Sequence, residues 1–211
     1  MSLYCVCDGS ADEAAGLLNK IERLSSEVER LEARVRLLDR LAHRDPLVDL
    51  PNLRSFIARL EQLIERAADG VPAAMLFVDV NGLKSINDSF GHMAGDQALT
   101  EVGQLLVASV RKTDFVARMH GDEFGILLGQ TDEWTAWKMA LRVFDAVGAA
   151  KFRVDGKLLP LSVAVGVGAI RPGDDPQSVI ARADRQMYRV KGAAETSGAV
   201  ASAFFSQAVA G

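Results

Sequence analysis

The N-terminal part of the chain carries a regular spacing of apolar residues, which step alternately by four and three positions. No glycine or proline interrupts the sequence between Leu17 and Arg44. Read as heptads, the pattern places leucine at every d position and mostly β-branched residues at a, which favours a parallel two-stranded coiled coil. We therefore expect a coiled-coil dimerisation helix over residues 13–44 and a homodimer. A single amphipathic helix that packs on its own domain is the alternative. The series is Leu17, Ile21, Leu24, Val28, Leu31, Val35, Leu38 and Ala42.

The remaining pattern alternates helical and strand-like segments. Pro46 disfavours helical backbone at the residue before it, so the first helix should end there. Apolar spacing predicts a domain of α+β class with a central, mainly antiparallel sheet flanked by helices. The dipeptide Asp155-Gly156 favours a tight hairpin turn. The predicted helices are 53–68, 95–110, 132–149 and 176–191, and the predicted strands are 73–80, 115–118, 124–128, 151–154 and 158–170.

Length and composition fit one domain with an extension. The chain has 211 residues, of which 49% are hydrophobic, enough for one sizeable core. We expect a disordered N-terminus over residues 1–12, a folded domain over 45–192 and a flexible tail over 193–211, where alanine, serine and glycine predominate.

Charge and cysteine usage narrow the function classes. The net charge of −4 argues against a nucleic-acid duplex as partner, because such partners demand a clustered basic face. No apolar stretch is long enough for a membrane segment, and no signal peptide is evident. Cys5 and Cys7 are too close together for an ordinary disulfide and too few for a zinc site. The sequence therefore predicts a cytoplasmic protein.

Two acidic clusters carry the candidate chemistry. Asp79 ends an apolar strand and precedes a glycine, Lys84 and the start of a helix. The N–H groups at a helix start, together with a lysine, can bind phosphates, and a carboxylate beside them can bind Mg²⁺. Asp122 and Glu123 occupy the expected turn between two apolar strands. Each cluster alone is also explained as a cap or a solvated turn. Together on neighbouring strands they predict a cation site that also holds a triphosphate.

Several segments, in this order and spacing, resemble the GGDEF domain of diguanylate cyclases. They are residues 45–52, 79–88, 91–96, 118–124 and 183–191. The resemblance covers about residues 44–192. It implies a GGDEF, nucleotidyl-cyclase-like fold and an enzyme that condenses two GTP molecules, one on each subunit of a dimer, into cyclic di-GMP and pyrophosphate.

The resemblance also implies a role for each matched residue. Asp79, Asp122 and Glu123 match the catalytic acids, and Asp79 and Asp122 with the carbonyl of Val80 match the ligands of Mg²⁺ (or Mn²⁺). The GTP-binding positions that it implies are Asn87 and Asp96 for guanine, Lys84 and Lys191 for phosphates, and Gly121 and His120 in the signature turn.

A site for inhibition by the product is implied as well. The family places an Arg-x-x-Asp motif five residues before the signature, and here Arg111 and Asp114 stand at that offset. An arginine can fork onto a phosphate or a guanine edge, and an aspartate accepts from guanine N–H groups. Arg142, on the following helix, is a further candidate contact.

His120 is the main departure from the family pattern, because it replaces the first glycine of the signature. Glycine serves a tight turn through positive φ or through close approach of a ligand, and an imidazole could crowd the α-phosphate or point harmlessly to solvent. Two hypotheses follow: an active, product-inhibited cyclase, or a catalytically impaired domain that acts as a cyclic di-GMP-binding effector. Smaller departures are Val48 and Asp49 for Thr-Gly, Ala164 for serine, and the missing Gly-Arg-Asn after Lys191.

Overall fold

The computed structural model describes residues 8–197, and their side chains over residues 15–192. The chain divides into two compact units, one that ends at Ala42 and one that begins at His43. Cys5, Cys7 and most of both predicted flexible ends lie outside the described residues.

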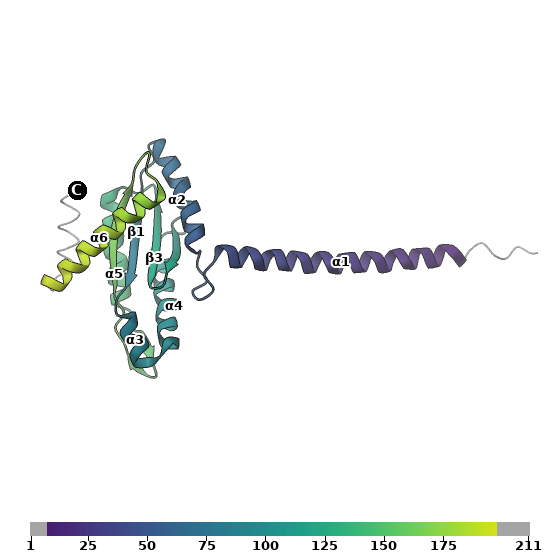
Figure 1. Ribbon diagram of the computed structural model, residues 1–211, viewed down its shortest axis with the longest axis horizontal. Helices are drawn as coiled ribbons and strands as arrows, with labels where there is room; N and C mark the ends of the chain where they lie inside the picture. Colours follow the sequence, from purple (N-terminus) through teal and green to yellow (C-terminus); the bar gives the residue numbers. More distant parts are fainter. Residues whose placement is uncertain (1–7, 198–211) are drawn as a thin grey trace, which may run out of the picture. The chain divides into compact units, whose positions relative to one another are not determined.

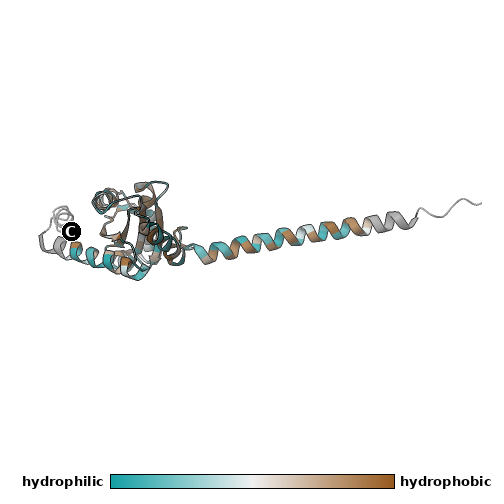
Figure 2. Ribbon diagram, turned by 90° about the horizontal axis from the view of Figure 1, so that it is seen from above, coloured by the Kyte–Doolittle hydropathy of each residue, from teal (hydrophilic) through white to brown (hydrophobic). Residues whose placement is uncertain are grey.

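The first unit is the single helix α1 (Asp8–His43). It begins at Asp8 rather than at residue 13, because the residues before the heptads include several alanines and acids, which tolerate helix. The apolar residues at a and d from Leu17 to Leu38 are between 50% and 64% exposed. Figure 2 shows these hydrophobic positions recurring along the helix. Within this unit the stripe therefore has no covering element.

The second unit is built on a four-stranded sheet in the order β2-β3-β1-β6. Its strands are β2 (Phe115–His120), β3 (Glu123–Gly129), β1 (Ala73–Val80) and β6 (Val163–Ile170). Every neighbouring pair is antiparallel, which confirms the predicted sheet. β1 lies in the interior, and its run of apolar residues is buried on both faces.

Helices cover both faces of this sheet (Figure 1). α2 (Leu53–Ala68) and α6 (Pro176–Ser197) pack on one face, where Met75 and Phe77 of β1 point. α4 (His92–Ser109) and α5 (Glu133–Gly148) pack on the other, where Leu76 and Val78 point. The short α3 (Leu83–Phe90) packs against α4. Alternation along β1 thus assigns each of its side chains to one helical layer.

Close packing of α6 on the sheet depends on a residue without a side chain. A Cβ at Gly166 in β6 would lie 2.1 Å from the backbone oxygen of Ala183 and 2.3 Å from the backbone nitrogen of Met187. No side chain fits in that space, so glycine lets the helix backbone approach the strand. This contact holds the middle of α6 closely against β6.

Several predicted elements differ from the observed ones. The sequence predicts only a helix start where α3 lies, and α4 begins at His92 because Gly91, at φ +84°, separates two helices. The strands of the β2–β3 hairpin are longer than predicted, so Glu123 lies in a strand and only Gly121 and Asp122 form the turn.

The predicted strand 158–170 is two strands. β4 (Arg153–Val154) and β5 (Lys157–Leu158) form a separate small hairpin, and β6 begins at Val163, because Pro160 cannot donate to a ladder. The Asp155-Gly156 turn itself is confirmed by φ values of +48° and +77°. At its C-terminal end, α6 continues to Ser197, into the segment predicted to be flexible.

The loop before α6 is held by an ion pair whose effect depends on pH. Asp174 accepts from both terminal nitrogens of Arg182, at 2.7 and 2.9 Å, and from the Arg171 N–H at 2.8 Å. The bond from Arg182 lowers the pKa of Asp174, so its stabilisation is present above the ordinary carboxyl pKa and is lost as pH falls through the depressed one. We expect Asp174→Asn to lower the free energy of unfolding by about 2 kcal/mol at pH 7.

Urea unfolding at pH 7 and below pH 4 would measure this difference. The gap between wild type and Asp174→Asn should shrink at the lower pH. Asp175→Asn is the matched control, because Asp175 caps α6 through the Ser178 N–H and asparagine caps equally well. A gap that stays constant down to pH 2 would contradict the assigned linkage.

Candidate functional site

The two predicted acidic clusters meet at one end of the sheet. Asp79 lies directly opposite Glu123 in the β1–β3 ladder, and the Val80 N–H donates to the Asp122 carbonyl at 3.1 Å. Asp79 has the same parity as Met75 and Phe77, so it faces the layer that contains α6. The sheet register therefore brings Asp79, Val80, Asp122 and Glu123 together.

Helix α6 adds a cation and a further acid to this end of the sheet. Lys191 Nζ donates to Asp79 Oδ1 at 2.8 Å, and this bond raises the pKa of the lysine ammonium. Burial raises the pKa of Glu123, and Asp122, Asp79 and Asp184 raise it further by repulsion. Asp184, a residue that the sequence reasoning did not assign to the site, thus contributes to its negative potential.

His120 does not strain the signature turn. The positive φ of the turn, +52°, falls on Gly121, whereas His120 is the last residue of β2 and pairs with Glu123. The ladder shifts register between Arg118 and His120, a bulge that absorbs the extra residue. The imidazole is exposed, and its positive charge would lower the pKa of Glu123. The concern that this position needs glycine for its backbone conformation is therefore not supported.

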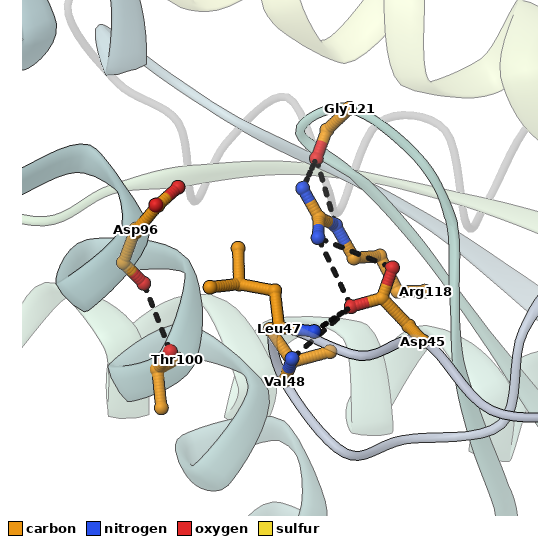
Figure 3. Close-up of polar contacts among 7 residues, drawn as sticks. All are labelled: Asp45, Leu47, Val48, Asp96, Thr100, Arg118 and Gly121. Atoms are coloured by element: carbon orange, nitrogen blue, oxygen red, sulfur yellow. Dashed lines mark hydrogen bonds and ion pairs between the residues drawn. The ribbon is translucent and has the colours of Figure 1, made fainter. Parts of the chain in front are cut away.

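Arg118 connects the signature turn to Asp45 (Figure 3). Its Nε and one terminal nitrogen donate to the Gly121 carbonyl at 2.9 and 2.7 Å, and the other terminal nitrogen donates to both carboxylate oxygens of Asp45 at 3.0 and 3.2 Å. The Arg118 side chain is only 13% exposed and the Asp45 side chain 21%. Asp45 also accepts from the N–H groups of Leu47 and Val48. Both residues lie in segments that resemble the family, 118–124 and 45–52, but nothing in the local sequence indicates that they meet.

The junction turn (residues 44–52) explains one departure from the family pattern. Asp49 adopts a φ of +50°, the conformation that the usual glycine would take, and aspartate tolerates it better than most residues. The Arg44 side chain donates to the Asp49 carboxylate at 2.7 Å and to its carbonyl. The turn thus keeps its shape without glycine.

The two residues expected to contact guanine lie on adjacent helices. A Cβ at Gly95 would lie 2.0 Å from Asn87 Oδ1, so the glycine admits the Asn87 side chain against the start of α4. Asp96 follows Gly95 and is exposed. It lines a cavity of about 500 Å³, together with Leu47 of the junction turn. Lys84 is exposed in the first turn of α3.

The residues of the predicted inhibitory site gather at the turn between α4 and β2. The Arg111 N–H donates to Asp114 Oδ2 at 2.9 Å, and the Asp114 N–H donates back to the Arg111 carbonyl at 3.0 Å. The side chain of Arg142, on α5, donates to the Ser109 carbonyl two residues before Arg111. All three side chains are at least partly exposed on one side of the domain.

The acidic end of the sheet suits a hard divalent cation that shares its ligands with a substrate. Among the described residues, no group of three or more histidine, cysteine, aspartate or glutamate side chains is arranged to hold a metal alone. Mg²⁺ ordinarily takes one or two carboxylates and completes its shell with water and substrate phosphates. The oxygen donors of Asp79 and Asp122, and the mutual repulsion recorded at Glu123, fit that chemistry.

Comparison with known proteins decides the family. The profile described as "Diguanylate cyclase, GGDEF domain" matches residues 42–197, well over half of the chain. The chain belongs to the GGDEF family. Among curated relatives, the response regulator PleD of Caulobacter vibrioides is 34% identical over 72% of this chain and 34% of its own length. Diguanylate cyclase DgcP of Pseudomonas aeruginosa is 31% identical over 83% of this chain and 26% of its own length.

Solved structures give the same fold. Diguanylate cyclase SiaD of Pseudomonas aeruginosa, in complex with its activator SiaC, superposes with a TM-score of 0.70 at 31% identity over 87% of this chain and 72% of that one. A second structure contains the coiled coil and GGDEF domain of DgcB from Caulobacter crescentus in complex with c-di-GMP. It superposes with a TM-score of 0.77 over 84% of this chain and 95% of that one. At 24% identity the DgcB likeness shows the fold alone.

This GGDEF chain spans roughly a quarter to a third of the length of the first curated relatives. Within residues 8–197, none of the helices combines the length and apolar character needed to cross a bilayer.

Proposed function

We propose that this chain is a diguanylate cyclase that condenses two GTP molecules into cyclic di-GMP and pyrophosphate. The observation that carries the proposal is the register of β1 and β3, which sets Asp79 opposite Glu123 and beside Asp122, with Lys191 bonded to Asp79. Three acids and a lysine at one strand end suit a metal-bound triphosphate. Because GTP is a cytoplasmic nucleotide, the proposal places the reaction in the cytoplasm.

Different residues of the chain bind the base and the phosphates of GTP. Asn87 and Asp96 contact guanine, the carboxylate of Asp96 accepting from its N–H groups. Lys191, whose pKa is raised by its bond to Asp79, is cationic at neutral pH, and with Lys84 it binds the phosphates. The Gly121 N–H region and the exposed His120 border the position of the α-phosphate. The reaction needs a second domain that also carries GTP, because the 3′-hydroxyl of that second GTP attacks the α-phosphate of the first.

Asp79, Asp122 and the Val80 carbonyl would hold Mg²⁺ or Mn²⁺. When bound, the cation would draw charge from the triphosphate and assist the departure of pyrophosphate. Glu123 remains the second acid of the signature and faces Asp79 across the ladder.

Product inhibition at Arg111, Asp114 and Arg142 completes the proposal. The Arg111 N–H already donates to the Asp114 carboxylate and the Asp114 N–H donates back to the Arg111 carbonyl, and the contact of Arg142 with Ser109 keeps its guanidinium near them. This preorganisation would lower the cost of binding a rigid dinucleotide. If turnover were absent, the same three residues would support the alternative function, a cyclic di-GMP-binding effector.

We expect purified wild type and His120→Gly, incubated with GTP and Mg²⁺, to form cyclic di-GMP at rates within about threefold of each other. The reason is that the turn places its positive φ on Gly121 and leaves the imidazole exposed. Chromatographic detection of the product would measure both rates. Product from His120→Gly alone, with cyclic di-GMP binding by both proteins, would favour the effector over the cyclase.

Dimerisation through α1 predicts a concentration effect. Leu31 occupies a central d position and is 50% exposed in the single chain. Leu31→Glu should convert the dimer to a monomer and lower the rate per chain about tenfold at micromolar protein, because the two domains must then meet by diffusion. Leu37→Glu, at a c position and 56% exposed, is the matched control and should remain dimeric. Sedimentation with a parallel assay would test this, and an active Leu31→Glu monomer would contradict it.

A further inference from the structure

The cavity beside Asp96 has walls from three separate parts of the chain. Leu47 comes from the junction turn, Met93 and Asp96 come from α4, and Phe152 and Arg153 come from the β4 hairpin. Figure 3 shows Asp96 on α4 beside Leu47. The volume of about 500 Å³ lies in the range of small-molecule sites. Its lining is mixed: Leu47, Met93 and Phe152 are apolar, and the other lining residues are polar or charged.

Arg153 gives the cavity a positive charge on a rigid support. Among the described residues that line the cavity, it is the only cation, whereas Asp96 and Glu101 are acids. The guanidinium donates to the Gly156 carbonyl at 3.1 Å, and its neighbours Phe152 and Val154 are buried in the core. Arg153 therefore lies at the cavity wall on a short, anchored hairpin.

A second contact fixes this hairpin to the helix that carries Asn87. Lys157 Nζ lies 5.8 Å from the centroid of the Phe90 ring, at the end of α3. The Leu159 N–H also donates to the Phe152 carbonyl at 2.9 Å, which closes the hairpin. The hairpin of Arg153 is thus held against the helix that carries Asn87, one of the two residues expected to contact guanine.

The charges of the cavity complement one nucleobase. Guanine presents N–H donors on its Watson–Crick edge, which a carboxylate accepts, and the acceptors O6 and N7 beside them, which an arginine fork binds. Adenine presents an amino group in place of O6, which the guanidinium would repel. The apolar side chains of Leu47, Met93 and Phe152 suit the faces and rim of a flat ring.

We propose that Arg153 is a specificity-determining residue, which donates to O6 and N7 of guanine. Asp96 accepts from the N–H groups of the Watson–Crick edge, on the other side of O6. This inference rests on the proposed function, since it takes the cavity beside Asp96 as the base site of GTP. It adds a residue from the β4 hairpin that none of the matched motifs includes.

Calorimetric binding of GDP tests the proposal, because GDP carries the same base and cannot be condensed. Arg153→Ala should weaken GDP binding about tenfold relative to wild type. Lys151→Ala removes an exposed positive charge two positions earlier and should change the affinity by less than twofold. Unchanged GDP affinity in Arg153→Ala would overturn the proposal.

The 7-deaza analogue of GDP separates base recognition from a general effect of charge. It lacks N7, so wild type should bind it at least threefold more weakly than GDP, whereas Arg153→Ala should bind the two equally. An equal loss in both proteins, or no loss in wild type, would show that Arg153 does not contact N7 and would overturn the proposal. GDP binding that depends on Arg153, without turnover of GTP, would support the proposal and refute the cyclase. Absence of GDP binding by wild type would overturn both.

Discussion

Replacement of Asp122 by asparagine is expected to lower cyclic di-GMP formation at least 100-fold. Asp122 lies in the turn of the signature hairpin, its carbonyl accepts from the Val80 N–H, and its carboxylate adds to the potential at Glu123. Asparagine preserves the size of the side chain but removes a charge that would face the metal and the triphosphate. Loss of one preorganised electrostatic group in such a site costs two to three orders of magnitude.

The readout must separate chemistry from folding and from the inhibitory site. Asp122→Asn should unfold at the temperature of the wild type within a few degrees and should still bind cyclic di-GMP at Arg111 and Asp114. Glu61→Gln, an exposed acid on α2, is the matched control and should keep full activity. A rate above one tenth of wild type in Asp122→Asn would refute the role assigned to its carboxylate.

Local signals in the sequence predicted many of the elements. Residues 53–68 and 73–80 match α2 and β1 because strong apolar periodicity coincides with clear boundaries. Asn52 caps α2, its side chain accepting from the Ser55 N–H at 3.1 Å, and Asp155-Gly156 forms the expected turn. Such interactions join residues close in sequence, so the sequence alone contains the information.

Features that depend on distant residues or on single backbone angles were missed. α3 has eight residues and is flanked by glycines with positive φ, Gly82 and Gly91, so its apolar pattern is too short to show a period. The break in the predicted strand 158–170 is different, because Pro160 is a local signal that the apolar pattern outweighed. At the site, the resemblance named Asp79 and Lys191, but their bond spans 112 positions and required the observed packing of α6.

The contact of Arg118 with Asp45 is another long-range interaction that sequence spacing did not indicate. Its position two residues before His120 lies within the signature block, yet its interaction with Asp45 spans 73 positions. Asp45 in turn accepts from the N–H groups of Leu47 and Val48, so one guanidinium connects the signature hairpin with a wall of the cavity beside Asp96. Sequence spacing gives no measure of such a link.

The second large effect is therefore expected at Arg118. Arg118→Ala should lower kcat about 100-fold, because the Gly121 carbonyl loses both of its side-chain donors and the turn moves relative to Asp79. It should also lower the free energy of unfolding by about 2 kcal/mol, because Asp45 is left without its cation. Steady-state kinetics with GTP and urea unfolding would measure the two effects.

Arg118→Lys distinguishes positioning from mere stability. Lysine keeps a positive charge near Asp45 but lacks the planar fork that reaches Gly121 and Asp45 at once. The variant should regain most of the stability, while kcat stays at least tenfold below wild type and the KM for GTP changes by less than threefold. Arg44→Ala, which removes only the exposed pair with Asp49, should keep kcat within threefold. If Arg118→Lys restored kcat together with stability, the arginine would act through the charge on Asp45 alone, and its hold on Gly121 would have no part in catalysis.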